Sequence, residues 1–218
     1  MGDYPVAVVK RRYDSTRRRR QAGETRQAIL DAAAVLFVDP GYAATPLTAV
    51  AAQAGVAIQT VYAVFGTKRQ LLSELVDVTI AGDDEPVALP ARPFVAEIAA
   101  LPDPAAKLAR FARHLAETNS RVAEVMLALA GAATADADAA AIWRKNLEER
   151  RLGMTGFARD LMSTGAIREG LDVERVADVL WLAMDVHNYD WLVRQRGWTL
   201  EEYQDWYVRT VSAAILAT

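Results

Sequence analysis

Two short helical segments on either side of a single glycine constrain the fold more than any other feature of this sequence. Apolar residues at helical spacing lead up to Gly55, and a second short segment with Val61 and Phe65 on one face begins soon after it. A preceding helix, expected over residues 24–38, ends at Asp39-Pro40-Gly41 because proline cannot continue a helix. Three helices with one tight glycine turn are typical of a helix-turn-helix unit.

The remainder of the chain also shows helical spacing. A fourth helix is expected from Lys68 to Ala81, and an acidic, proline-rich loop follows over residues 82–93. Further helices are expected over residues 94–100, 104–119, 121–132, 136–164, 173–195 and 200–217. Alanine, the strongest helix former, is the commonest residue, and neither a strand pattern nor an internal repeat is visible. The sequence therefore predicts an all-α fold.

Capping residues indicate where several of these helices begin. Thr45 is expected to cap the second helix, with Pro46 at its first helical position, where the missing N–H costs nothing. Ala57 precedes the third helix and has no side-chain oxygen that can accept a backbone hydrogen bond. Thr199 and Glu202 have the spacing of a capping box at the start of the last helix.

The residue inventory excludes several classes of protein. There is no cysteine, which removes disulfides, thiol catalysis and thiolate zinc sites. The two histidines, His114 and His187, have no neighbours at metal-ligand spacing. No apolar run reaches the roughly 18 residues of a membrane span, and residues 1–30 lack the apolar core of a secretory signal. We therefore expect a soluble, cytoplasmic protein with no membrane partner, no metal site and no cofactor.

Charge is distributed unevenly along the chain. The formal net charge is −3, yet residues 1–70 hold ten Lys or Arg against five Asp or Glu, and the remainder is acidic. The basic residues gather before the first helix, at Lys10, Arg11, Arg12, Arg17, Arg18, Arg19 and Arg20. A basic head on an acidic body indicates that the head meets a polyanion, with a solvated, non-binding tail as the alternative.

Residues 26–72 carry a specific set of motifs. They include Ile29-Leu30-x-x-Ala33, Leu36-Phe37, Gly41-Tyr42, Thr45, Ala54-Gly55-Val56, Thr60-Val61-Tyr62, Phe65, Lys68 and Leu71-Leu72. This run resembles the TetR/AcrR family of transcriptional regulators, and the stretch from Asp185 to Leu216 resembles a common C-terminal part of the family. The resemblance implies a homodimer that represses transcription and releases DNA when a small ligand enters the C-terminal domain.

The start of the third helix is the expected reader of DNA, since that end of a helix-turn-helix approaches the base edges in the major groove. Gln59 can bond an adenine edge with its carboxamide, and Ile58 can contact a thymine methyl group. The hydroxyl groups of Thr45, Thr60 and Tyr62 are candidates for phosphate contacts.

Two groups of cations complete the predicted DNA-binding surface. Lys68 and Arg69 stand in the first turn of the fourth helix, where the helix dipole disfavours cations, and a bound phosphate explains Lys68 there. The family resemblance implies that the arginines before the first helix form an arm that reaches into a minor groove. These arginines are Arg17, Arg18, Arg19 and Arg20.

The expected domains are a basic arm over residues 1–22, a DNA-binding domain over 23–69, and a larger helical ligand-binding and dimerisation domain over 70–218. Helices 173–195 and 200–217 are the expected dimer interface, because a palindromic operator calls for a two-fold symmetric protein. Residues expected to line a largely apolar effector pocket are Phe111, His114, Met126, Trp143, Phe157, Trp181, Met184, His187 and Asn188. Two alternatives stay open: the same residues can be ordinary core residues, and the two helices can close the core of a monomer.

Two other functions remain to be compared with a ligand-responsive repressor. An enzyme is not predicted, because the sequence has no metalloprotease motif, glycine-rich phosphate loop or nucleophile elbow. A sequence-tolerant, architectural DNA-binding protein that uses only the basic arm is the second alternative. Scrambling the operator distinguishes a specific regulator from an architectural protein, because only the specific regulator then loses its affinity for the DNA sharply.

Overall fold

The chain is helical throughout the computed structural model, which describes residues 13–83, 85 and 87–217. Its α-helices are α1 (Tyr13–Leu36), α2 (Leu47–Gln53), α3 (Ile58–Phe65), α4 (Lys68–Ala81), α5 (Pro93–Ala100), α6 (Pro104–Ala132), α7 (Ala137–Met162), α8 (Val173–Ala183), α9 (Val186–Tyr189) and α10 (Leu200–Ile215). π-Helical turns, Phe37–Gly41 and Asp190–Gln195, follow α1 and α9. Within the described ranges no strand forms, apart from one β-bridge between Ile167 and Leu216. The all-α prediction is confirmed.

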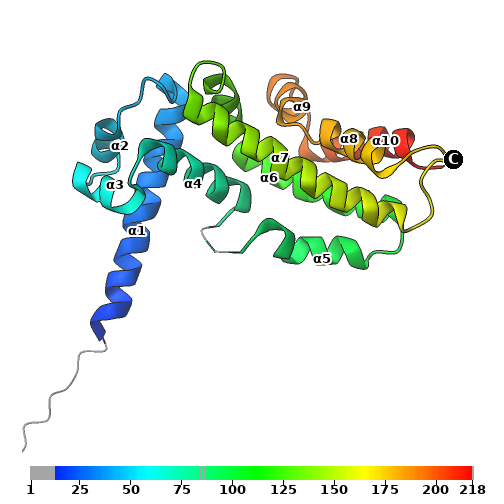
Figure 1. Ribbon diagram of the computed structural model, residues 1–218, viewed down its shortest axis with the longest axis horizontal. Helices are drawn as coiled ribbons and strands as arrows, with labels where there is room; N and C mark the ends of the chain where they lie inside the picture. Colours follow the sequence, from blue (N-terminus) through cyan, green and yellow to red (C-terminus); the bar gives the residue numbers. More distant parts are fainter. Residues whose placement is uncertain (1–12, 84, 86, 218) are drawn as a thin grey trace, which may run out of the picture.

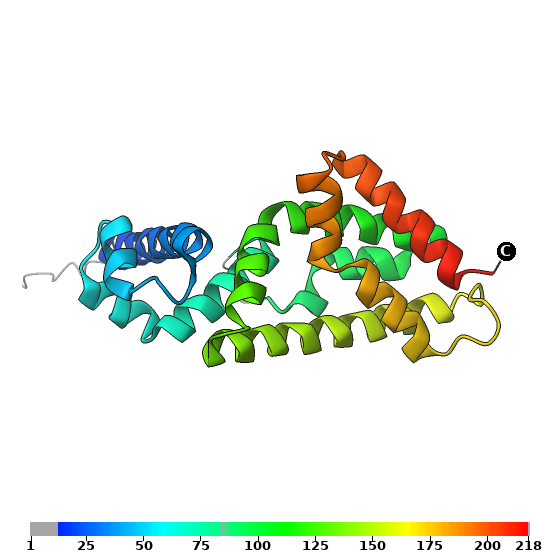
Figure 2. The ribbon, with the colours of Figure 1, turned by 90° about the horizontal axis from the view of Figure 1, so that it is seen from above.

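The helices are arranged as a small unit at one end of an elongated molecule and a larger body at the other. α1, α2 and α3 form the small unit, and α4 leads from it into the body of α5 to α10 (Figure 1). In the body, α10 packs on α6 and α8 packs on α7, as the view from above shows (Figure 2). None of the described helices alone is long and apolar enough to cross a membrane; only the bent pair of α2 and α3 has the required length and composition when combined.

The small unit has its own apolar core. Ile29 and Leu30 of α1 are buried together with Val50 of α2 and with Val61 and Phe65 of α3. α2 and α3 meet at an angle of 108° across the glycine turn. Two helices that cross at such an angle on a third are the arrangement of a helix-turn-helix, as the sequence predicts.

The body differs from the predicted helix boundaries at two places. The predicted break at Ser120 is wrong, because the Ser120 hydroxyl donates to the Glu117 carbonyl inside a continuous α6, which satisfies the polar side chain within the helix. The predicted helix 173–195 is instead broken after Met184. There the Asp185 carboxylate accepts the backbone N–H of His187 and so caps a new helix, α9.

The N-terminal part also departs from two predictions. α1 begins at Tyr13 and not at Glu24, so residues 13–22 are helical and continuous with the small unit. Residues 1–12 lie outside the described part of the chain. The predicted cap at Thr45 is wrong, because α2 begins at Leu47 with Pro46 in the capping position. Ala57 precedes α3 without a side-chain cap, as predicted.

α4 connects the two parts of the molecule. It ends at Gly82, which has a left-handed backbone (φ 82°). A Cβ at this position would lie 3.2 Å from Nη2 of Arg121 on α6, so a larger residue would require the guanidinium to move by a few tenths of an ångström, besides straining the left-handed backbone. The C-terminal end of α4 is therefore in direct contact with the body.

A buried lysine ties α5 into the body. The Lys107 side chain, 3% exposed, donates from Nζ to the carbonyls of Ile98 (2.9 Å) and Ala99 (3.0 Å) at the end of α5. Its ammonium also lies 2.8 Å from the Asp160 carboxylate of α7. One cation thus joins α5, α6 and α7.

Candidate functional site

α3 has one buried and one exposed face. Val61 and Phe65 are buried, whereas Gln59 is exposed and Tyr62 is 54% exposed. Because Gln59 and Tyr62 are three residues apart on a helix, they lie on the same side of it. Ile58 and Thr60 are half-buried, and Ile58 packs against the core. A carboxamide and a phenol therefore point outward from a helix that is held rigidly from behind.

Lys68 has partners inside the protein. Its ammonium donates to the Tyr42 carbonyl oxygen and lies 4.2 Å from the centroid of the Tyr42 ring. Burial lowers the pKa of Lys68, and the nearby Asp136 carboxylate opposes that shift. These contacts attach the start of α4 to the segment before α2. They account for a cation at this helix start without the bound phosphate that the sequence suggested.

Thr45 is buried and its hydroxyl is already used. The side chain is 2% exposed, and Oγ1 donates to the carbonyls of Leu36 (2.7 Å) and Gly41 (2.9 Å). It therefore satisfies backbone acceptors at the π-helical turn after α1. This position differs from the surface role in phosphate binding that the sequence suggests.

The start of α7 brings two acidic residues to the small unit, and no local signal in the sequence indicates this proximity. Asp138 lies 3.4 Å from Arg69 of α4. Burial, Asp136 and Asp138 together raise the pKa of Tyr42 to about 12. Both aspartates stand in or before the first turn of α7, where acids are common. Only the packing of α7 beside α4 gives them these neighbours.

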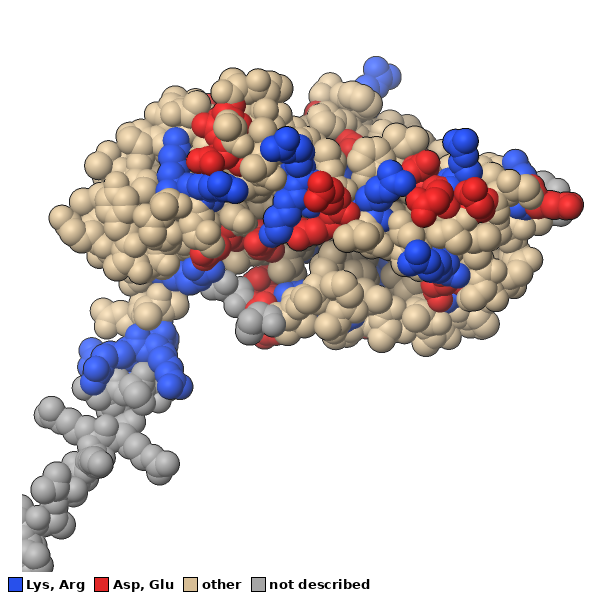
Figure 3. Space-filling model, viewed as in Figure 1, with Lys and Arg blue, Asp and Glu red and all other residues tan. Residues whose placement is uncertain are grey.

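The predicted basic cluster lies on the projecting part of α1. Arg17, Arg18, Arg19 and Arg20 are exposed, and Arg20 is 3.5 Å from Glu24, one turn further along the helix. In the space-filling view they form a basic group set apart from the body, where basic and acidic side chains alternate (Figure 3).

The residues predicted to line an effector pocket are spread through the interior of the body. Phe111 contacts Phe157 (centroids 5.0 Å apart) and Tyr207 (5.6 Å), and His114 stacks on Phe94 at 3.6 Å. Met126 is buried, and the following predicted residues are partly buried against the core: Trp143, Phe157, Trp181 and Met184. The structure therefore brings Phe111 and Phe157 into contact, whereas the ring of His114, one turn further along α6, stacks on Phe94 of α5.

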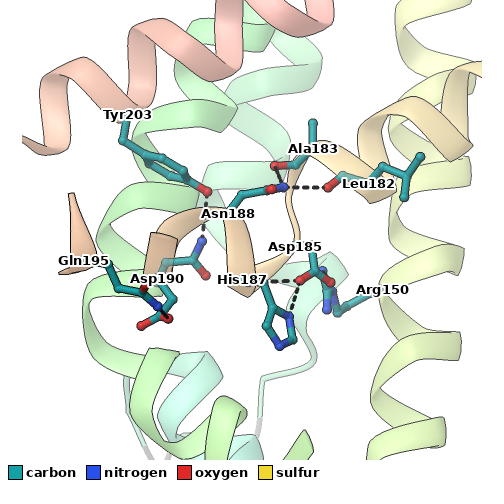
Figure 4. A network of polar contacts seen from close by, with 10 residues as sticks. Arg150, Leu182, Ala183, Asp185, His187, Asn188, Asp190, Gln195 and Tyr203 are labelled. Carbon is teal, nitrogen blue, oxygen red and sulfur yellow. Dashed lines mark hydrogen bonds and ion pairs between the residues drawn. The ribbon is translucent and has the colours of Figure 1, made fainter. Parts of the chain in front are cut away.

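His187 and Asn188 lie at the break between α8 and α9, where their polar groups already have partners (Figure 4). His187 Nδ1 is 2.8 Å from Asp185, and Asn188 Nδ2 donates to the carbonyls of Leu182 and Ala183. Burial acts to raise the pKa of Asp185, but hydrogen bonds from His187 and the charge of Arg150 outweigh it and lower the pKa. The network stabilises the break.

Six buried side-chain polar atoms in the described part of the chain have no hydrogen-bond partner. Three of them are Asn146 Oδ1 on α7, Trp181 Nε1 on α8 and the Tyr207 hydroxyl on α10. Burial raises the pKa of Tyr207 well above its usual value. Since most buried polar groups in proteins are hydrogen-bonded, these atoms mark the interior of the body as a place where a polar ligand atom or water finds a partner.

Two surface grooves lie near these elements. One, of about 220 Å³, runs between α1, α4 and α6 and includes Leu30, Val78 and Arg121 in its walls. The other, of about 210 Å³, lies between α7 and α8 beside Trp181.

The motif residues of the small unit identify its family. Residues 29–75 match the model of a family described as bacterial regulatory proteins, tetR family. Residues 29–75 form a TetR-family domain. The match covers the buried part of α1, all of α2 and α3 and the first half of α4, and the resemblance inferred from the sequence is confirmed.

Solved structures of other proteins share most of this fold. FadR from Bacillus subtilis, in complex with stearoyl-CoA, is 21% identical with a TM-score of 0.68, covering 85% of this chain and 96% of that one. SmeT, in complex with triclosan, is 20% identical with a TM-score of 0.68, covering 88% and 92%. A TetR transcription regulator from Haloarcula marismortui is 19% identical with a TM-score of 0.64, covering 89% and 100%. Among curated proteins no relative matches. The likeness shows the fold, in which the small helical unit that matches the tetR family model is followed by a larger helical domain.

Proposed function

We propose that this protein is a ligand-responsive transcriptional repressor that binds a palindromic operator and leaves it when a small molecule binds the body. The observation that carries the proposal is the exposed face of α3, with Gln59 and Tyr62 side by side in a TetR-family domain. Such a helix places its N-terminal residues at base edges in the major groove. Neither motifs nor fold neighbours support an enzyme, and the proposed place of action is the cytoplasm.

In the proposed complex Gln59 reads an adenine edge and Ile58 contacts a thymine methyl group. Tyr62 and Thr60 donate to phosphates. Lys68 also contacts a phosphate in the proposed complex. Its ammonium has three N–H donors, so it can bind a phosphate while it donates to the Tyr42 carbonyl. Thr45, whose hydroxyl is buried and bonded, is left out of this surface.

A homodimer is part of the proposal, because one α3 alone reads too few base pairs. The interface is formed by α8, α9 and the following π-helical turn, together with α10. Two large apolar side chains on these elements support it: Leu182 is 61% exposed and Trp191 is 55% exposed. A symmetric interface that covers such residues also sets the distance between the two α3 helices.

The proposed effector binds inside the domain that follows α3, which we assign to residues 70–218, after an arm over 1–22 and a DNA-binding domain over 23–69. The apolar contacts of Phe111 and Phe157 and the unpartnered atoms of Asn146, Trp181 and Tyr207 support a ligand with an apolar body and a few polar atoms. The neighbours solved with stearoyl-CoA and triclosan support a small-molecule role for this domain.

A selection from a random duplex library tests the proposal. The wild-type protein is compared with the double variant Gln59→Ala/Tyr62→Ala, whose two side chains are exposed and do not hold the fold. Leu152→Ala on α7, 72% exposed and far from α3 in the chain, is the matched control. We expect the wild type and the control to recover one palindromic motif and the double variant to recover none.

If all three proteins enrich the same sequences equally, α3 does not read DNA and the architectural alternative replaces the proposal. The projecting basic helix is the feature that would then explain binding. A palindrome recovered by the wild type and by the control, but not by the double variant, excludes that alternative.

A further inference from the structure

The first half of α1 extends beyond the domain that the helix belongs to. α1 runs from Tyr13 to Leu36, but its first buried residue is Ile29, and residues 17–24 are all exposed. At 1.5 Å per residue, residues 13–28 span about 24 Å. In Figure 1 this segment leaves the small unit and points away from the body. We call residues 13–25 the helical extension.

The extension is attached firmly where it meets the domain. The Arg26 guanidinium forms an ion pair with Glu74 of α4 and lies 5.0 Å from the centroid of the Phe65 ring of α3. Residue 26 therefore connects α1 to both of the helices that follow the glycine turn. Because α1 is continuous through residue 26, these contacts fix the orientation of the helical extension relative to α3 and α4.

The extension carries a cation on every side. Four consecutive arginines, residues 17–20, follow one another at 100° steps around the axis, and all are exposed (Figure 3). Any flat or grooved polyanion beside this helix meets about two of them at once. By contrast, an extended chain can bring all four to the same strand of phosphates.

The helix is weak by itself. Isolated helices of this length are marginal in water, and Gly23 is a poor helix former in a position where a Cβ would meet nothing within 4 Å. Arginines three positions apart also repel each other. A polyanion that neutralises them therefore favours the helical form.

We propose that the helical extension binds DNA as a helix, along the sugar–phosphate backbone next to the site that α3 reads. This inference rests on the DNA-binding function proposed above and replaces the minor-groove arm expected from the family resemblance. The physical reason is size, because an α-helix with its side chains is about 10–12 Å across, whereas the minor groove is about 6 Å wide. The contact is to phosphates, so it adds affinity on any sequence and lengthens the protected region of an operator.

Substitutions at Gly23 test the inference while leaving every arginine in place. Gly23→Pro interrupts the helix, since proline removes a backbone donor and clashes with the preceding turn. Gly23→Ala is the matched control, because the added methyl group has open space and favours the helix. A third variant, with residues 17–20 changed to glutamine, removes the charge. Residue 23 is exposed and outside the core, so all three variants are expected to fold, which the thermal unfolding midpoint checks.

The readout is the salt dependence of binding to a random-sequence duplex and, separately, to the selected operator. For the charge variant we expect the slope of log Kd against log salt to fall by about 2 per protomer, as for the loss of two phosphate contacts. Gly23→Pro should lose most of the same slope, and Gly23→Ala should keep it or bind more tightly.

Three results overturn the inference. If Gly23→Pro binds like the wild type while the charge variant loses slope, the arginines act as a flexible arm. A loss of slope near 4 per protomer in the charge variant also indicates an extended arm. If the charge variant itself binds like the wild type, the extension does not contact DNA. Binding to a random-sequence duplex does not require α3 to read bases. This test can therefore be interpreted even if the operator selection fails.

Discussion

Lys107→Met is the substitution for which the structure gives the clearest expected effect. Methionine keeps the length and apolar stem of the side chain but removes the ammonium group. The change deletes hydrogen bonds to the Ile98 and Ala99 carbonyls, at 2.9 and 3.0 Å, and the 2.8 Å ion pair with Asp160.

The expected loss of stability is about 3–5 kcal/mol. A hydrogen bond to a charged group contributes about 1.5–3 kcal/mol, and breaking a buried ion pair by removing one partner costs about 3–5 kcal/mol. Two effects oppose the sum: the ammonium no longer has to be desolvated, and the Asp160 side chain is 29% exposed and can turn to water. We therefore expect a value near the lower limit, about 3 kcal/mol.

Urea unfolding followed by circular dichroism measures this loss. The control is Lys145→Met on α7, because the Lys145 side chain is 54% exposed and its contacts with Asp77 (3.9 Å) and Glu149 (3.6 Å) are long. Exposed pairs contribute between about 0 and 1 kcal/mol. The two substitutions remove the same charge, but only Lys107 is buried and donates to backbone carbonyls.

An effect of Lys107→Met no larger than that of Lys145→Met would refute the reasoning. It would mean that the Lys107 ammonium is hydrated in solution and does not connect α5 to α7. A double variant with Asp160→Asn refines the result, since a true pair makes the second substitution cost less in the Lys107→Met background than alone.

Three further predictions concern pH, a buried hydroxyl and sequence reading. Burial, with the charges of nearby arginines, lowers the pKa of His114 to about 4. As the pH falls, His114 is therefore protonated in the unfolded chain before it is protonated in the folded protein. The free energy of unfolding thus decreases between about pH 6.5 and 4, by at most about 3 kcal/mol. His114→Gln should flatten this pH dependence of urea unfolding, and an unchanged pH profile would contradict the assignment. Thr45→Val should lower the free energy of unfolding by about 1–3 kcal/mol, because two carbonyls lose their donor. A variant with full stability but weakened DNA binding would instead indicate that the Thr45 hydroxyl contacts a phosphate. Gln59→Ala should relax preference at one base pair by about 1–3 kcal/mol in competition binding, whereas equal losses on operator and random DNA would exclude base reading.

Local signals in the sequence were sufficient for the DNA-binding unit. Gly55 and the apolar spacing around Val61 fix a turn between two helices, and these signals act over a few residues. The start of α1 was not predictable in the same way. Residues 17–24 are all exposed, and an exposed arginine-rich segment has the same composition whether it is a helix or a coil.

The neighbours of Lys68 depend on packing that the sequence does not display. Its partners are Tyr42, 26 positions away, and Asp136, which approaches because α7 packs on α4. For the same reason the unpartnered atoms of Asn146 and Trp181 were not predictable, since burial of an amide or an indole N–H is a property of the assembled helices. The sequence pattern indicates which residues are apolar, but it does not indicate which polar groups those residues enclose.

The contact between Gly82 and Arg121 makes α4 a lever with one end in each part of the molecule. The helix has 14 residues and is therefore about 21 Å long. A tilt of about 5° around the Gly82 end displaces Lys68 and the attached α2–α3 unit by about 2 Å, from the length of the rod alone. In a two-fold dimer the separation of the two α3 helices changes by up to twice that amount, about 4 Å, which exceeds the 3.4 Å rise of one base pair along each strand. In the proposed dimer, a rearrangement of α6 that tilts α4 would therefore move the two α3 helices away from a fixed spacing of operator half-sites.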